Sequence, residues 1–273
     1  MGTGALGRHH VRILAGLPGA ELVGVHDAST AAAQAVTAEL APGTRVYESL
    51  DALAGEVEAM VVAVPTTAHA EVGGRLLARG IHVLVEKPMA SSLAEADRLL
   101  EQADRAGRIL AVGHVEFYNP AVQALVGLAT PPRFVEVQRL GVFSPRSLDV
   151  DVILDLMIHD LQILHALDPS PVAEIRATGI PVLSPRIDIA NARVALESGG
   201  VANLTASRVS AERVRKLRAF LPSRYYSLDY QAQEIRGYRL EAPAPGEERP
   251  RIVPADLTVE RAEPLARELT AFL

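Results

Sequence analysis

The first part of the chain, up to about residue 117, alternates short apolar runs with amphipathic stretches of helical period. The apolar runs predict strands buried on both faces at 22–27, 59–65, 81–86 and 109–114. The stretches around them predict helices at 9–17, 29–40, 67–79 and 91–106. This regular alternation is typical of a parallel sheet covered by helices.

The pattern changes after Asn119 and Pro120. Longer runs, several of them alternating polar and apolar residues, predict mainly antiparallel strands at 134–143, 172–182, 187–196, 201–209, 216–222 and 225–240. One helix, at about 150–167, interrupts them. We therefore expect an α/β protein of two domains. Residues 1–118 form the parallel domain, and residues 119–273 form an α+β domain with a large, open, mainly antiparallel sheet.

Composition narrows the function classes. The 273 residues are 49% hydrophobic and 22% charged, with a net charge of −6 and no long basic run, which argues against a nucleic-acid partner. The absence of cysteine excludes disulfides and thiolate zinc sites. No apolar run approaches the roughly 18 residues of a membrane span, and no secretory signal is visible, so we expect a cytoplasmic protein.

A glycine-rich turn opens the chain. Gly2, Gly4 and Gly7 have the spacing G-x-G-x-x-G, with Ala5 and Leu6 between them, directly ahead of a predicted helix. Glycine at these positions lets a turn be tight and lets backbone N–H groups approach a pyrophosphate at a helix N-terminus. The alternative is a chance glycine turn, because glycine is common. His9 and His10 follow; they could lie near the phosphates or the ribose, but a solvated helix face is the favoured expectation.

Asp27 ends the next predicted strand, 20 residues after Gly7. An acid at this distance hydrogen-bonds the adenosine ribose and repels a 2′-phosphate, so the pattern favours NAD over NADP. Only Met1 precedes Gly2, whereas such a turn follows the central strand of its sheet. We expect that this first strand is missing from the chain as given.

Glu86, Lys87 and Pro88 follow a buried strand. Lys87 is therefore expected at the carboxyl edge of the sheet, beside the nicotinamide, where an ammonium can hydrogen-bond a substrate hydroxyl. The alternative is a surface lysine at a strand end. Pro65, Thr66 and His69 follow another strand and are expected to line the cofactor.

Asp155 and His159 lie four residues apart in an apolar helical stretch, so they share one helix face. A carboxylate can orient an imidazole that acts as a general base. The alternative is a helix cap or a core histidine, and Asp160 is a second candidate partner. Glu116, Tyr118 and Asn119 lie where the two domains join, and they line either a substrate pocket or a structural hinge. No residues have convincing metal-ligand spacing, so we expect no metal.

These motifs together resemble the Gfo/Idh/MocA oxidoreductase family, which has a Rossmann domain followed by an open-sheet domain. The Glu-Lys-Pro triplet and the Asp-x-x-x-His pair carry most of the resemblance. It implies that Lys87, Asp155 and His159 form the catalytic set, that NAD is the cofactor, and that the Lys87–Pro88 bond is cis. The family continues beyond the helix expected near Glu263, so the C-terminal helices are also expected to be missing.

Three segments, at 115–121, 149–160 and 202–208, resemble members that oxidise the 3-hydroxyl of UDP-N-acetylglucosamine in making diamino-sugar lipid A. The resemblance implies an NAD-dependent dehydrogenase acting on a CH–OH group of a nucleotide sugar. From its residue chemistry alone, Arg208 is a candidate to bind the diphosphate, because its guanidinium presents a fork of donors. Either His159 or Lys87 is the base. The alternatives are an inositol or simple-sugar dehydrogenase of the same family, and a non-catalytic NAD-binding regulator or inactive fragment. The open sheet is expected to form a homodimer or homotetramer interface.

Overall fold

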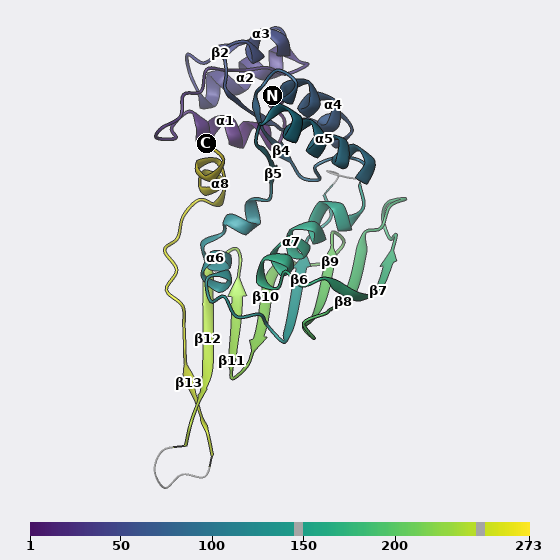
Figure 1. Cartoon of the computed structure of the whole chain (residues 1–273), viewed down its shortest axis with the longest axis vertical. Helices are drawn as coiled ribbons and strands as arrows, with labels where there is room; N and C mark the ends of the chain where they lie inside the picture. The colour runs from purple at the N-terminus through teal and green to yellow at the C-terminus, as the bar shows by residue number, and fades with distance from the viewer. Residues whose placement is uncertain (145–149, 244–248) are drawn as a thin grey trace. The chain divides into compact units, whose positions relative to one another are not determined.

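The computed structural model describes residues 1–144, 150–243 and 249–273. The chain forms two compact units: Met1–Val115 together with Leu265–Leu273, and Glu116–Pro264 (Figure 1). Each unit has its own apolar core. The predicted fold class is confirmed: a parallel α/β unit is followed by a unit built on a large, mainly antiparallel sheet.

The first unit alternates helices with short parallel strands. In chain order these are α1 (Gly7–Leu14), β1 (Gly24–Val25), α2 (Thr30–Leu40), β2 (Arg45–Val46), α3 (Leu50–Ala54), β3 (Ala59–Val62), α4 (Thr66–Leu77), β4 (His82–Glu86), α5 (Leu93–Ala106) and β5 (Leu110–Gly113). The strands pair as two separate parallel sheets, β1–β2 and β3–β4–β5. Their carboxyl ends point the same way within each sheet.

Local chemistry sets several helix ends in this unit. The hydroxyls of Ser29, Ser49 and Ser92 each accept a hydrogen bond from the backbone N–H three residues later, which starts α2, α3 and α5. Gly107 ends α5 with a φ of 60°, a conformation that costs glycine little.

The last helix, α8 (Pro264–Phe272), groups with the first unit, although the sequence assigned it to the second domain. Its apolar side explains the difference. Leu269 is fully buried in a cluster with Ile13 of α1 and Leu84 of β4, and Leu265 and Phe272 pack against the same cluster. Burial of these side chains holds α8 on the first unit.

The second unit contains η1 (Val115–Tyr118) at its start, α6 (Pro120–Val126), the π-helical turn η2 (Ile153–Met157) and α7 (Ile158–Leu167). Its strands are β6 (Phe134–Leu140), β7 (Val172–Ile180), β8 (Ile189–Leu196), β9 (Val201–Ser207), β10 (Val214–Leu221), β11 (Arg224–Asp229), β12 (Glu234–Glu241) and β13 (Arg251–Pro254). They form one sheet in the order β13-β12-β11-β10-β6-β9-β8-β7. Only β6 and β9 pair in parallel.

The sheet of the second unit has one covered face and one open face. Figure 1 shows α6 and α7 over one face. There Ile163 and Leu167 of α7 join Val135, Val137 and Leu204 of the sheet in the core. The predicted strand at 225–240 is two strands with a turn between them. Among the residues that the structure describes, no helix combines the length and apolar character needed to cross a membrane.

Candidate active site

The glycine turn lies at the N-terminus of α1. Gly2 has a φ of +84°, and a Cβ there would overlap the Ala63 carbonyl oxygen. A Cβ at Gly7 would overlap the Gly2 carbonyl oxygen. These two glycines are therefore required by the protein's own packing, since any larger residue displaces backbone.

Gly4 is different, because a Cβ there would meet nothing within 4 Å. The protein alone gives no steric reason for glycine at this position. No side chain caps α1, whose N-cap position is occupied by Leu6. An open space beside an uncapped helix N-terminus fits a phosphate group approaching the backbone. The turn therefore fits the pyrophosphate of a dinucleotide.

Asp27 follows β1 and faces the same turn. Its Oδ2 accepts hydrogen bonds from the backbone N–H of Thr3 (2.7 Å) and from the Thr3 hydroxyl (2.9 Å). Its Oδ1 accepts one from the Ser29 N–H (2.9 Å). Partial burial alone raises the pKa of Asp27, but the hydrogen bonds from Ser29 and Thr3 outweigh burial and hold it below its ordinary value. Asp27 therefore stays a carboxylate and can accept hydrogen bonds from ribose hydroxyls.

Pro65 and Thr66 stand where β3 passes into α4, and Pro65 is the N-cap residue, with no side-chain cap bond. His69, in the first turn of α4, is only 1% exposed. Its Nδ1 lies 2.8 Å from the Pro88 carbonyl oxygen and its Nε2 lies 2.9 Å from that of Val64. The Nδ1 of His69 thus faces the turn after β4 and its Nε2 faces the segment after β3, so the ring packs between the two segments that carry Pro65 and Lys87.

Lys87 is half-buried at the carboxyl end of β4, where the sequence placed it, and the Lys87–Pro88 peptide bond is cis, as the resemblance implied. Glu86 beside it is buried. Its Oε1 lies 2.7 Å from the His10 Nε2, and its Oε2 accepts the Lys87 backbone N–H at 3.2 Å. Gly113 leaves room for this carboxylate, because a Cβ there would crowd it. Glu86 therefore fixes the backbone that carries Lys87.

His10 lies beside Glu86, a contact that the sequence did not indicate. It was expected on a solvated helix face, but it is 3% exposed and pairs with Glu86. Glu268 of α8 is 1% exposed, and neither of its carboxylate oxygens has a hydrogen-bond partner in the described part of the chain. Burial, and then the negative charge of Glu86, raise the pKa of Glu268 to about 8. Glu268 is therefore neutral near pH 7.

In the second unit, Asp155 lies in the π-helical turn and His159 in the first turn of α7. His159 is 7% exposed, so its ring is largely shielded from water. Single π-helical turns within helices are frequent at functional sites, because they change the direction of side chains along the helix. The predicted helix at 150–167 is present as a π-helical turn, Ile153–Met157, followed by the α-helix Ile158–Leu167.

Asp160, the alternative partner of His159, is instead paired with Arg139 of β6. Its two oxygens accept three hydrogen bonds, of 2.7 to 3.1 Å, from the Arg139 Nε and Nη2. The two side chains are each 1% exposed. Burial lowers the pKa of Arg139, but the charge of Asp160 outweighs it, so the guanidinium stays charged. This buried pair fastens α7 to the sheet next to His159.

The residues expected to bind substrate are largely engaged within the second unit. Glu116 accepts hydrogen bonds from Arg139 (3.1 Å) and Arg215 (3.2 Å). Asn119 caps α6 by accepting the Ala121 N–H, and donates to the Tyr230 carbonyl oxygen. Both side chains thus make contacts inside the second unit, and their role in binding substrate stays a prediction. The Tyr118 ring is partly buried and lies edge-on to Phe117.

Arg208 is 5% exposed, and its guanidinium group donates hydrogen bonds within the protein. Its Nε donates to Asp188 (2.8 Å), its Nη1 to the Val150 carbonyl oxygen (3.0 Å) and its Nη2 to the Ser184 hydroxyl (3.3 Å). The structure thus gives Arg208 a packing role that the residue type alone did not indicate. Asp149, in the resembling segment, lies outside the described residues. Within the described residues, no His, Asp and Glu side chains group as metal ligands.

Comparison with known proteins agrees with this geometry. Residues 1–114 match the model of the oxidoreductase family with an NAD-binding Rossmann fold, Gfo/Idh/MocA. The whole chain is 38% identical to a UDP-N-acetylglucosamine 3-dehydrogenase from Acidithiobacillus ferrooxidans and covers 86% of its length. A solved structure of that enzyme superimposes with a TM-score of 0.90, over 99% of this chain and 85% of the other, at 36% identity.

A more distant relative is the myo-inositol dehydrogenase Hyg17 of Streptomyces leeuwenhoekii. It is 29% identical over 76% of this chain and 68% of its own length. The similarity to the first relative spans both units. The chain therefore belongs to the Gfo/Idh/MocA family of NAD-binding oxidoreductases.

Proposed function

We propose that this protein oxidises the 3-hydroxyl of UDP-N-acetylglucosamine to a ketone and passes the hydride to NAD⁺. The observation that carries the proposal is the 38% identity, over the entire chain, to an enzyme of that name. The cofactor half of the proposal is supported by the open side of Gly4 and by the ionised Asp27.

The first unit offers the groups that would hold the cofactor. Backbone N–H groups of the turn from Gly2 to Gly7 would bind the pyrophosphate, and Asp27 would accept the ribose hydroxyls. Pro65, Thr66 and Lys87, at the carboxyl ends of β3 and β4, would border the rest of it. Bound NAD⁺ supplies the hydride acceptor.

Residues of the chain would remove the proton of the substrate hydroxyl. Oxidation of a secondary alcohol releases a hydride from carbon and a proton from oxygen, so one base is needed. His159 or Lys87 would take that proton, and the other would hydrogen-bond the oxygen. Asp155 would orient the His159 imidazole and stabilise its charged form. The products would be the ketone, NADH, which carries the hydride, and the protonated base (imidazolium or ammonium), which carries the proton.

A second candidate is an inositol or simple-sugar dehydrogenase, which the likeness to a myo-inositol dehydrogenase favours. It would not need the UDP group. A third, an NAD-binding regulator without turnover, would bind the cofactor and oxidise nothing. These three candidates differ in which compounds give NADH, and that is what the experiment measures.

The test is NADH formation, followed by absorbance, with NAD⁺ and UDP-N-acetylglucosamine, N-acetylglucosamine or myo-inositol. Lys87→Ala should lower turnover by about 100-fold or more. The chain contains only one other lysine, the exposed Lys216 of β10, so Lys216→Ala is a matched control and should retain activity. Turnover with inositol alone would favour the second candidate. NAD⁺ binding without any turnover would favour the third.

We also propose that the protein is a cytoplasmic homo-oligomer formed through the open face of the sheet. That face carries a row of rings from Phe134, Phe220, Tyr225 and Tyr238, with neighbouring centroids 4.9 to 6.4 Å apart. Phe220 and Tyr238 are about 40% exposed, and exposed apolar patches of this kind mark interaction surfaces. Light scattering should give a dimer or tetramer, and Phe220→Glu should give a monomer.

A further inference from the structure

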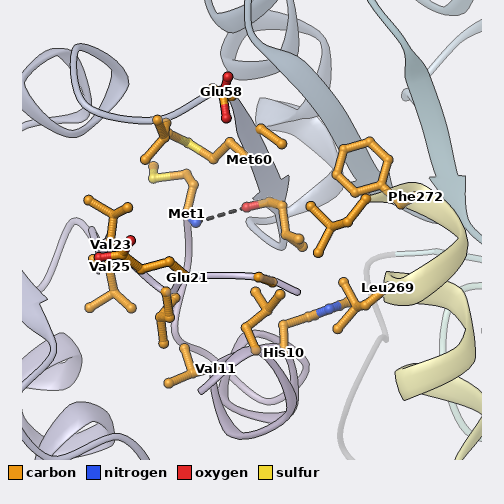
Figure 2. Close-up of a pocket in the computed structure, with 18 of the residues that line it drawn as sticks. Met1, His10, Val11, Glu21, Val23, Val25, Glu58, Met60, Leu269 and Phe272 are labelled. Atoms are coloured by element: carbon orange, nitrogen blue, oxygen red, sulfur yellow. Dashed lines mark hydrogen bonds between the residues drawn. The ribbon is translucent and has the colours of Figure 1, made fainter. Parts of the chain in front are cut away.

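The proposed substrate carries a diphosphate, and a diphosphate binds to cationic side chains that have unused donors. Arg208 donates its hydrogen bonds within the protein. The cavity of about 700 Å³ in the first unit does not offer such a site either (Figure 2). Its lining, among the described residues, contains no arginine or lysine, and the carboxylates of Glu21 and Glu58 border it. A site for the diphosphate is therefore expected in the second unit.

Arg215 lies near the start of β10, directly opposite Arg139 in the pairing of β10 with β6. Leu217 and Val137, two residues away along these strands, are both in the core, so the two arginines lie on the same, helix-covered face. Like charges directly opposite each other destabilise a sheet. Glu116 offsets part of this effect, because its Oε1 accepts a hydrogen bond from each arginine, at 3.1 and 3.2 Å. A local conflict of this kind is typical of a functional position.

The two arginines differ in how fully their donors are used. The Arg139 side chain is 1% exposed, and its Nε, Nη1 and Nη2 all donate to Asp160 or Glu116. The Arg215 side chain is 26% exposed and makes, among the described residues, a single hydrogen bond, from its Nη1 to Glu116. A guanidinium has five N–H donors in a planar fork. The Nε and Nη2 of Arg215 are therefore available to a ligand.

Arg213, two residues before Arg215, adds a second available cation. It is exposed and makes no hydrogen bond or ion pair with any described residue. Its charge acts on Arg215, as do the charges of Arg139, Glu116 and Asp160. Three guanidinium groups and two carboxylates leave this cluster with one positive charge in excess. Burial, and then the charge of Arg139, lower the pKa of Arg215 below its ordinary value, so a bound anion would stabilise its charged form.

The cluster lies next to the candidate general base. Arg139 pairs with Asp160, the residue after His159 in the first turn of α7. One buried ion pair therefore separates Arg215 from the turn that carries His159. In a nucleotide sugar, the sugar ring likewise separates the diphosphate from the 3-hydroxyl. A single substrate can therefore meet Arg215 with its phosphates and His159 with its hydroxyl.

We propose that Arg213 and Arg215 bind the diphosphate of the nucleotide-sugar substrate. The Nε and Nη2 of Arg215 present two parallel donors to phosphate oxygens, and Arg213 adds a second positive charge beside them. This inference rests on the proposed function, because it names the residues that recognise the UDP group. A sugar monophosphate has the same kind of oxygen atoms, so the test includes one.

The test is calorimetric titration with UDP and with glucose 6-phosphate, each with and without NAD⁺. The variants are Arg215→Met and Arg213→Met. The matched control is Arg218→Met, because Arg218 lies on the same strand but on the open face and also has one carboxylate partner, Glu136 at 2.7 Å. Thermal melting checks that each variant is folded. Arg213 has no partner to lose among the described residues, so Arg213→Met tests the site even if Arg215→Met unfolds.

The parent protein should bind UDP at least about tenfold more tightly than glucose 6-phosphate, because a diphosphate engages both arginines. Arg215→Met should weaken UDP binding by about 30-fold and Arg213→Met by about fivefold, whereas Arg218→Met should change it by less than about twofold. The KM for UDP-N-acetylglucosamine should rise with the UDP dissociation constant. The affinity for NAD⁺ should not follow it.

Three results would overturn the proposal: no UDP binding by the parent protein, equal UDP affinity in the parent and both site variants, or tighter binding of glucose 6-phosphate than of UDP. Oxidation of UDP-N-acetylglucosamine with unchanged UDP affinity in both site variants would overturn this site alone and leave the proposed function standing. UDP binding that depends on Arg215, without NADH formation, would support the site and count against the proposed function.

Discussion

The candidate binding regions of the two units differ in the space that the protein leaves for a ligand. At the glycine turn of the first unit, Gly4 leaves space that the protein does not fill, and Asp27 keeps an ionised carboxylate at the turn. In the second unit, the candidate substrate residues Glu116, Asn119 and Arg208 spend their hydrogen bonds on the protein itself. Residue type alone does not separate these two cases. Space left by the protein does: Asp27 also accepts hydrogen bonds from Thr3 and Ser29, but it lies at a turn where Gly4 is open on one side.

The largest effect should come from breaking the buried pair of the second unit. Arg139→Met leaves Asp160 buried without its partner, and it should lower the free energy of unfolding by about 3–5 kcal/mol. The double variant Arg139→Met/Asp160→Leu should recover most of that loss, because it removes both charges. Denaturant unfolding measures both. Arg176→Met, at an exposed site, should cost less than about 0.5 kcal/mol. A single variant as stable as the parent would contradict the assigned role of the pair.

A variant at Gly4 can separate cofactor binding from protein stability. Gly4→Val should weaken NAD⁺ binding by about 100-fold, roughly 2.7 kcal/mol, because the side chain occupies the space meant for phosphate. Its Tm should stay near that of the parent protein, since the added Cβ meets nothing within 4 Å. Calorimetry and thermal melting measure the two quantities. Gly16→Ala is the control, because Gly16 is also open but lies beyond the other end of α1. Unchanged NAD⁺ affinity in Gly4→Val would remove the main support for a pyrophosphate site at the glycine turn.

Glu268 should make stability depend on pH. Its folded pKa of about 8 lies above its ordinary value of 4.5, so the folded protein holds one more proton between these values. The contribution of Glu268 to the free energy of unfolding is therefore most favourable near pH 4.5 and falls as the pH rises towards 8. Glu268→Gln should gain about 2 kcal/mol at pH 8.5 and little at pH 5. Melting curves of the variant, its parent and the exposed-site control Glu71→Gln measure this. A gain that is equal at both pH values would contradict it.

The smallest expected effect concerns the choice of cofactor. Asp27→Asn keeps the shape of the side chain but removes the charge that repels a 2′-phosphate. It should weaken NAD⁺ binding by about tenfold, roughly 1.4 kcal/mol, and improve the relative binding of NADP⁺. Titration with both cofactors measures the ratio, with Asp51→Asn as the surface control. If NADP⁺ binding relative to NAD⁺ does not change, Asp27 does not set the preference.

Sequence patterns predicted the first unit well because its signals are local. The glycine spacing, the acid after β1 and the lysine after β4 each lie within one strand–turn–helix segment, and the order of such segments implies a parallel sheet. What they could not predict are pairings between distant positions. His10 meets Glu86 across 76 residues, and α8 returns to α1 from the far end of the chain. Neither contact has a signature in the residues around it.

In the second unit the sequence predicted β6 to β10 and the helix that carries His159, but it ran β11 and β12 together and missed β13. It also did not predict the use of the charged side chains. Asp160 pairs with Arg139 on a strand 21 residues earlier. Arg208 pairs with Asp188, on the segment entering the neighbouring strand. The sequence alone does not distinguish an arginine that pairs with a buried carboxylate from an arginine that binds a phosphate. Only the three-dimensional register distinguishes them.

The position of β6 has a consequence for the making of the protein. Both neighbours of β6 come later in the chain: it pairs with β9 in the register Phe134↔Val201, and with β10 beyond that. At 5–20 residues per second, the ribosome needs roughly 3 to 13 seconds to reach the first partner. During that time the nascent chain displays Val135 and Val137 on a strand with neither edge paired, and α7 is completed before the sheet it covers. The centre of this sheet is thus the part of the molecule that most needs protection during synthesis.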